Sequence, residues 1–218
     1  MDHSFQFFEP SDALTIIEHR LPHWSQAGTI CFITWRTYDS LPASVLQSWH
    51  DERRRWLLQQ GVQLDTYPEC LQQLSPHMRK EYHTLFSGRW HQHLDDGHGS
   101  CELQRPEVAK IVADSLLHFD GSRYLLTDFV VMPNHVHVLA SFVDEASLLN
   151  QCESWKHFTA TQINRFLGRK GRFWQQDGFD HLVRSEEQFQ FLRKYLYDNP
   201  VRAKLRQNQF VHYSKVLS

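Results

Sequence analysis

Two histidines separated by one residue lie in the apolar stretch VVMPNHVHVLASF, residues 130–142. Side chains at positions i and i+2 of a β-strand point to the same face, so His135 and His137 would project together, with Val136 and Val138 directed oppositely, toward helices. Two imidazoles held on a rigid strand can bind one divalent metal ion. The spacing alone leaves two interpretations open, a metal site and the commoner pair of hydrogen-bonded core histidines.

A second candidate group lies in YLYDNP, residues 195–200. Residues four apart on a helix share a face, so the Tyr195 hydroxyl and the Asn199 amide can approach one site. At about 100° per residue, Tyr197 points roughly 200° away, toward a different surface. The spacing alone also fits ordinary roles, with Tyr195 packed at the edge of an apolar helical stripe and Asn199 as a helix C-cap before Pro200.

Hydrophobic periodicity and turn signals predict the elements that must position these residues. Pro133-Asn134 predicts a hairpin turn, and Ser185 with Gln188 a capping box. Pro200 is expected to end the last helix. The glycine-flanked His98 is expected in an ordinary turn. The predicted strands cover 28–37, 123–132, 135–142 and 179–184, and the predicted helices cover 43–60, 77–94, 106–120, 153–167 and 186–199.

This order, β-α-β-β-α-β with a terminal helix, predicts an α+β, ferredoxin-like fold: an antiparallel sheet backed by helices on one face. The first helical region is overlong. We therefore expect a single domain, 1–218, with its core at 28–205 and a helical insertion at about 43–100. The scattered cysteines predict reduced thiols rather than a disulfide framework; they are Cys31, Cys70, Cys101 and Cys152.

The composition is that of a globular chain, with 41% hydrophobic and 22% charged residues. No apolar run is long enough to span a membrane, and the acidic N-terminal stretch lacks the basic region of a signal peptide, which predicts a cytoplasmic location. The net charge of −2 alone argues against a nucleic-acid binder. Residues 151–218, however, contain 12 Lys or Arg and 6 Asp or Glu, a balance of +6. This basic end is a candidate footprint for an anionic ligand, although a solvated basic face is the commoner explanation.

Two separated motifs resemble a known family. MPNHVHVL resembles the HUH motif (His, apolar, His) of the single-tyrosine HUH transposases. The segment from SWKHF to DNPVRAKL resembles the REP-associated tyrosine transposases of that superfamily. It contains, in this order, Trp-Gln, Phe-Asp-His, Arg and Tyr-x-x-x-Asn-Pro. The resemblance covers about residues 28–205. It implies that Tyr195, on the C-terminal helix, is the nucleophile, and that His135, His137 and Asn199 bind Mg²⁺ or Mn²⁺.

The resemblance also implies metal-dependent cleavage and transfer of single-stranded DNA through a 5′-phosphotyrosine intermediate, on REP-like hairpins in the bacterial nucleoid, by a monomer or a homodimer. We expect the histidines on the sheet's open face, within reach of DNA. Basic residues interleaved with Trp155, Phe166 and Phe173 suit backbone neutralisation and base stacking, unless those aromatics belong to the core. The candidate DNA-binding residues are Lys156, Arg165, Arg169, Lys170, Arg172, His181 and Arg184.

Two alternatives remain at this stage. In the first, the chain binds hairpin nucleic acid without catalysis, and the tyrosine is structural. In the second, it is another His-x-His metal-dependent phosphohydrolase. The second is less favoured because the sequence contains no HxxEH motif, and because residue 139, where a third alternating histidine would lie, is leucine.

Overall fold

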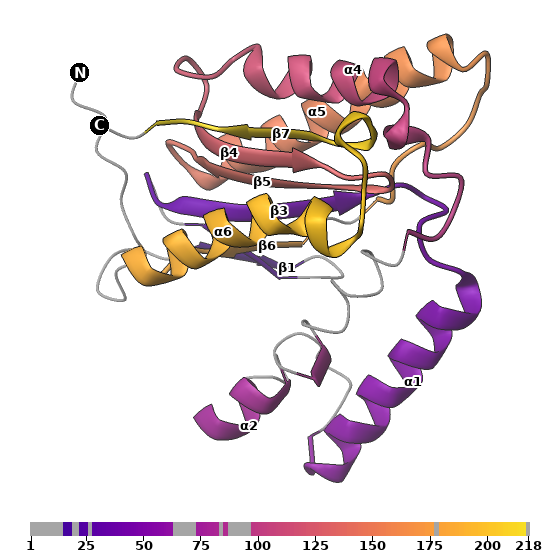
Figure 1. The fold of residues 1–218 in the computed structure, drawn as a ribbon. Helices are drawn as coiled ribbons and strands as arrows, with labels where there is room; N and C mark the ends of the chain where they lie inside the picture. The colour runs from indigo at the N-terminus through magenta and orange to yellow at the C-terminus, as the bar shows by residue number, and fades with distance from the viewer. Residues whose placement is uncertain are drawn as a thin grey trace.

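The computed structural model describes residues 15–18, 22–25, 28–62, 73–82, 85–86, 97–176 and 179–216. Figure 1 shows the arrangement of the elements. The strands are β1 (Thr15–Glu18), β2 (Pro22–Ser25), β3 (Ile30–Arg36), β4 (Leu125–Val131), β5 (His135–Ser141), β6 (Phe179–Leu182) and β7 (Val211–Ser214). The helices are α1 (Ala43–Gln59), α2 (Pro76–Tyr82), η4 (Glu102–Gln104), α4 (Pro106–Leu117), α5 (Glu145–Phe166), α6 (Glu186–Arg202) and η5 (Gln207–Gln209).

The main sheet has five strands in the order β6-β3-β5-β4-β7, and every neighbouring pair is antiparallel. Its first four strands have the order that the βαββαβ pattern requires, so the predicted α+β fold with an antiparallel sheet is confirmed. The hairpin of β1 and β2 and the edge strand β7 were not predicted. In the pairing of β3 with β5, Thr34 is opposite His137 and Arg36 is opposite His135.

Both faces of the sheet are covered by helices. One face packs on α4 and α5 through residues that include Ile33, Trp35, Val136 and Val138. The other face packs on α6 through residues that include Phe32 and Leu139 (Figure 1). The expectation of helices on one face holds for α4 and α5 and is wrong for α6. The reason is that β3, β4 and β5 are apolar at both odd and even positions, so each face needs a cover.

The terminal helix α6 begins as predicted and ends later than predicted. The Ser185 side chain caps it by accepting a hydrogen bond from the Gln188 amide. The prediction that Pro200 ends the helix is wrong, because α6 continues to Arg202 and the Ala203 amide donates to the Asn199 carbonyl at 3.0 Å. A proline removes only its own N–H from the helix, so later residues can still bond backward. Asn199 therefore lies inside the helix and is not its C-cap.

The insertion contains α1 and α2, which share a small apolar cluster with residues 85–86. Within it, the Trp49 indole donates to the Phe86 carbonyl at 3.3 Å. Much of the predicted helix 77–94 lies outside the described residues.

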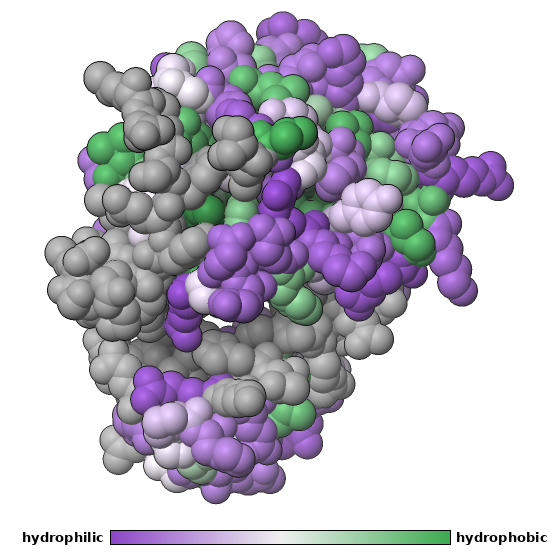
Figure 2. Space-filling model, turned by 60° about the vertical axis from the view of Figure 1, so that its left-hand side comes forward, coloured by the Kyte–Doolittle hydropathy of each residue, from purple (hydrophilic) through white to green (hydrophobic). Residues whose placement is uncertain are grey.

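In the part of the chain that the structure describes, no helix is both long and apolar enough to cross a bilayer. Figure 2 shows one face of the molecule, on which hydrophilic residues predominate and apolar residues are dispersed.

Candidate active site

The two histidines of the HVH motif lie side by side on β5, on the sheet face that α6 covers. Their ring centroids are 4.7 Å apart, while Val136 and Val138 pack on the opposite face, as the strand spacing predicts. Both His135 and His137 are 0% exposed. The expectation of an open face is therefore wrong, because α6 packs over the apolar residues of the same face.

Hydrogen bonds to neighbouring strand and turn residues orient both imidazole rings. His137 Nδ1 lies 2.7 Å from Thr34 Oγ1, across the strand pair, and its ring stacks on Phe32 at a centroid distance of 5.2 Å. His135 Nδ1 lies 2.7 Å from Asn134 Oδ1. Since Nδ1 of each ring is used in this way, a metal ion would be bound through Nε2, the arrangement typical of protein metal sites.

Of the two tyrosines in YLYDNP, Tyr195 is the one beside the histidines. Its ring centroid lies 5.5 Å from that of His137, and its hydroxyl oxygen is buried. The Arg202 guanidinium carbon lies 5.7 Å from the Tyr195 ring centroid. Tyr197 is 66% exposed and contacts His212 with a centroid distance of 5.7 Å. The sequence prediction that the two tyrosines face different surfaces is confirmed.

Asn199 follows Tyr195 by one helical turn and is completely buried. Among the described residues, neither its amide oxygen nor its amide nitrogen has a hydrogen-bond partner. α6 runs along the strands, with Tyr195 beside His137. Four residues of helix advance about 6 Å, and two residues of strand about 6.6 Å. Asn199 is therefore expected at the level of His135.

The donor set of this site suits a divalent cation. A buried primary amide without a partner costs about 1–3 kcal/mol, a cost that an amide acting as a ligand would recover. Within the described residues, no group of three or more His, Cys, Asp or Glu side chains could hold a metal ion. Because no acidic side chain or further histidine joins the pair among these residues, a metal ion bound there would need a neutral oxygen atom as its third ligand. Two imidazole nitrogens from His135 and His137 with the Asn199 amide oxygen fit Mn²⁺ or Mg²⁺.

Three further polar residues of the site were missed by sequence reasoning. Thr34 and Arg36 on β3 face His137 and His135 across the strand pair, and Asn134 lies in the hairpin turn. Arg36 is only 6% exposed, and its Nη1 donates to Ser40 Oγ at 3.0 Å. The signal that could have found two of them is the i, i+2 spacing of polar residues in the otherwise apolar strand ICFITWR.

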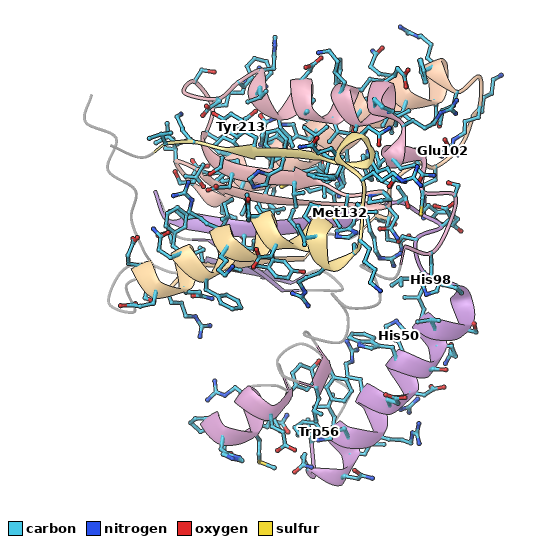
Figure 3. All side chains as sticks on the ribbon, viewed as in Figure 1. His50, Trp56, His98, Glu102, Met132 and Tyr213 are labelled. Atoms are coloured by element: carbon cyan, nitrogen blue, oxygen red, sulfur yellow. The ribbon has the colours of Figure 1, made fainter. Side chains whose placement is uncertain are left out.

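Three loops meet at the hairpin end of the sheet. The Thr37 amide donates to the Asn134 carbonyl at 2.8 Å, and the Tyr38 amide to the Phe173 carbonyl at 2.8 Å. From the third loop, the His98 carbonyl accepts from Asn134 Nδ2 at 3.0 Å. In Figure 3, Met132 marks the hairpin end of the sheet and His98 lies beyond it. The loops 37–40, 97–104 and 169–175 thus surround the end at which His135 lies.

Comparison with known proteins adds little to this geometry. No protein-family model and no curated protein matches the chain. A comparison with solved structures finds one described as a REP-associated tyrosine transposase bound to a REP hairpin, with a TM-score of 0.35 and 14% sequence identity, over 81% of this chain and 69% of that chain. These values indicate a distant structural relationship.

The predicted DNA-binding residues do not all gather near the histidines. Arg169, Lys170 and Arg172 lie in or beside the loop at the hairpin end, and the Arg172 guanidinium carbon is 5.4 Å from the Tyr38 ring centroid. Lys156 and Arg165 lie on α5, on the opposite face of the sheet. Arg184 is exposed between β6 and α6. The backbone of His181 pairs with Phe32 on β3.

The aromatic residues expected to stack on bases are mostly core residues. Trp155 is 1% and Phe173 2% exposed, whereas Phe166 is 50% exposed. The core interpretation is therefore correct for the first two. Tyr38, which the sequence did not single out, is 55% exposed and lies beside Arg172. An exposed ring next to a cation at the hairpin end of the sheet is suited to a nucleic-acid base and its phosphate.

Proposed function

We propose that this protein cleaves and rejoins single-stranded or hairpin DNA in a metal-dependent reaction, with Tyr195 as the nucleophile. The observation that carries the proposal is the cluster of Tyr195, His137 and His135, with centroid distances of 5.5 and 4.7 Å. One helical turn from Tyr195 lies the buried amide of Asn199, which has no hydrogen-bond partner among the residues that the structure describes. A phenol, two oriented imidazoles and an amide oxygen supply a nucleophile and a ligand set from two adjacent elements.

The reaction would be a transesterification at phosphorus. Tyr195 Oη forms a bond to phosphorus while the bond from phosphorus to the 3′ oxygen breaks, which gives a 5′-phosphotyrosyl link and, after proton uptake, a free 3′-hydroxyl. A phenol with an ordinary pKa of about 10 is mostly protonated at neutral pH, so its proton must pass to an acceptor or to solvent as the bond forms. When bound by His135, His137 and Asn199, Mg²⁺ or Mn²⁺ supplies positive charge against the phosphate oxygens.

Other residues of the chain would hold the DNA strand. Arg36 places a buried positive charge opposite His135, where its guanidinium can bind a phosphate oxygen. Tyr38 and Arg172, at the hairpin end, can stack on a base and neutralise a phosphate next to the scissile one. The phosphotyrosyl link is itself a phosphodiester and conserves the energy of the bond that breaks, so a 3′-hydroxyl can attack it, release Tyr195 and join the strand to a new 3′ end.

A pair of tyrosine variants tests the proposal. Purified wild type, Tyr195→Phe and Tyr197→Phe are incubated with Mg²⁺ or Mn²⁺ and hairpin oligonucleotides from the DNA that flanks the gene, and mass spectrometry detects phosphotyrosyl adducts after denaturation. We expect an adduct with wild type and with Tyr197→Phe. Tyr195→Phe should form none and should still bind the hairpin. An adduct with Tyr195→Phe would show that the nucleophile is another residue.

The complete burial of both histidines favours a second candidate function, a hairpin-binding protein in which the cluster is structural. Buried histidines with hydrogen-bonded rings also occur in ordinary cores. The same experiment separates the two functions, because a binding protein retains the hairpin but forms no adduct in the wild type with either metal ion.

A further inference from the structure

We propose that Asn134 is a positioning residue that fixes the tautomer of His135 and couples this ring to the loop at 97–101. Asn134 is completely buried in the hairpin turn between β4 and β5. Its side chain joins two groups, the His98 carbonyl oxygen at 3.0 Å and His135 Nδ1 at 2.7 Å. The consequence for metal binding rests on the proposed function, whereas the hydrogen-bond argument concerns the metal-free protein.

The chemistry of these two hydrogen bonds leaves one assignment. A carbonyl oxygen can only accept, so the amide nitrogen of Asn134 must face His98 and its amide oxygen must face His135. The amide oxygen also can only accept, so the proton of this second bond belongs to His135 Nδ1. A neutral imidazole carries one N–H, and the lone pair of His135 is therefore on Nε2. This is the tautomer that binds a metal ion through Nε2.

The second histidine is held differently. His137 Nδ1 bonds to Thr34 Oγ1 at 2.7 Å, and a hydroxyl group can donate or accept. This hydrogen bond is compatible with either tautomer of His137. In the metal-free protein, the hydrogen bond from His135 to Asn134 therefore fixes which ring nitrogen of His135 carries the proton. The hydrogen bond between His137 and Thr34 does not fix it for His137.

The loop that holds Asn134 is itself closely packed. Gly99 has a φ of +92°, and a Cβ atom there would lie 2.6 Å from the Asp39 carbonyl oxygen, so only glycine fits this approach. The Ser100 amide donates to Asp39 Oδ2 at 2.8 Å. Figure 3 shows His98 at this edge of the main body, beyond the hairpin end of the sheet. The His98 carbonyl is thereby held in place, and a shift of the loop would be transmitted through Asn134 to His135.

The test reads the tautomer directly. Long-range ¹H–¹⁵N spectra of the metal-free, ¹⁵N-labelled full chain at about pH 8, where ordinary histidines are neutral, are recorded for wild type, Asn134→Asp, Asn134→Leu and the exposed control Asn150→Leu. Comparison with His135→Gln assigns the His135 signals. We expect Nδ1–H in wild type and Asn150→Leu. Asn134→Asp should retain it, because a carboxylate still accepts from Nδ1, and Asn134→Leu should shift to the Nε2–H form that free imidazole favours.

A second measurement links the tautomer to metal binding. Titration with Mn²⁺, followed by electron paramagnetic resonance, should show an affinity about 10- to 100-fold weaker for Asn134→Leu than for wild type, and no change for Asn150→Leu. A wild-type His135 with Nε2–H overturns the proposal, even if Asn134→Leu does not fold. A tautomer that Asn134→Leu leaves unchanged overturns it as well. If the tautomer results hold and wild type forms no DNA adduct, the proposed function fails while the assignment of Asn134 stands.

Discussion

The helix that carries Tyr195 and Asn199 is fastened to the sheet by a buried ion pair. Arg193 Nε lies 3.1 and 3.0 Å from the two carboxylate oxygens of Asp128 on β4. Its Nη2 donates to Ser214 Oγ on β7 at 2.7 Å. The Asp128 side chain is 1% exposed and that of Arg193 22%. We predict that Arg193→Met strongly destabilises the fold.

The expected magnitude follows from what the substitution leaves behind. Without Arg193, the described structure leaves the Asp128 carboxylate with the Ser214 hydroxyl at 2.6 Å. Removing one partner of a buried ion pair costs about 3–5 kcal/mol. Because Arg193 is partly exposed, we expect the lower end, about 3 kcal/mol of the free energy of unfolding. Adding Asp128→Asn should recover part of this loss, since a neutral amide is cheaper to bury than an unpaired carboxylate.

The assay is urea denaturation followed by tryptophan fluorescence, and the neighbouring residue supplies a matched control. Lys194 pairs with Asp198 at 2.6 Å, but its side chain is 74% exposed. An exposed helical ion pair contributes about 0.3–0.5 kcal/mol, so Lys194→Met should have little effect. Equal losses for Arg193→Met and Lys194→Met would refute the claim that the Asp128 pair fastens α6.

Three other perturbations test the site and its surroundings. Thr34→Val removes the hydroxyl that orients His137 and should weaken Mn²⁺ binding about 10-fold by paramagnetic resonance; equal affinity would contradict this role. Arg172→Ala should reduce the salt dependence of single-stranded DNA affinity, the slope of log K against log salt, by about 0.7, and Lys110→Ala on α4 should not. Burial lowers the pKa of His212, so below about pH 6.5 the unfolded chain binds more protons than the folded protein, and the free energy of unfolding falls as the pH drops. His212→Gln should flatten this decline, measured by urea titrations at a series of pH values.

The hydrophobic pattern predicts the main sheet well because its strands are long and apolar. β3, β4 and β5 have seven residues each, and their order with the two crossover helices leaves few possible topologies. β7 was missed because Val211–Ser214 is short and of mixed polarity. Such an edge strand forms because β4 offers it unpaired backbone groups, and a partner of this kind is invisible in the local sequence.

Contacts of the candidate site within one element could be predicted from the sequence, whereas contacts between elements could not. The spacing within HVH and within YLYDN predicts which side chains share a face, since both partners lie on one element. Thr34 and His137 are 103 residues apart in the chain, and their contact depends on the register of β3 against β5. Whether Trp155 faces DNA or the core likewise depends on which side of α5 meets the sheet. A mixture of basic and aromatic residues carries no information on that choice.

The burial of the histidine pair sets a condition on DNA chemistry at this site. A phosphate cannot reach His135 and His137 across the sheet face while α6 covers it. The helix is fastened by Arg193, six residues before Asn199. Pro200 lies in the last turn of α6, between Asn199 and the end of the helix at Arg202. Because proline has no backbone N–H, this turn has one backbone hydrogen bond fewer than a regular helical turn. We therefore expect a phosphate that enters at the hairpin end to be accommodated by a local shift of the last turn of α6, which leaves the ion pair of Arg193 with Asp128 in place.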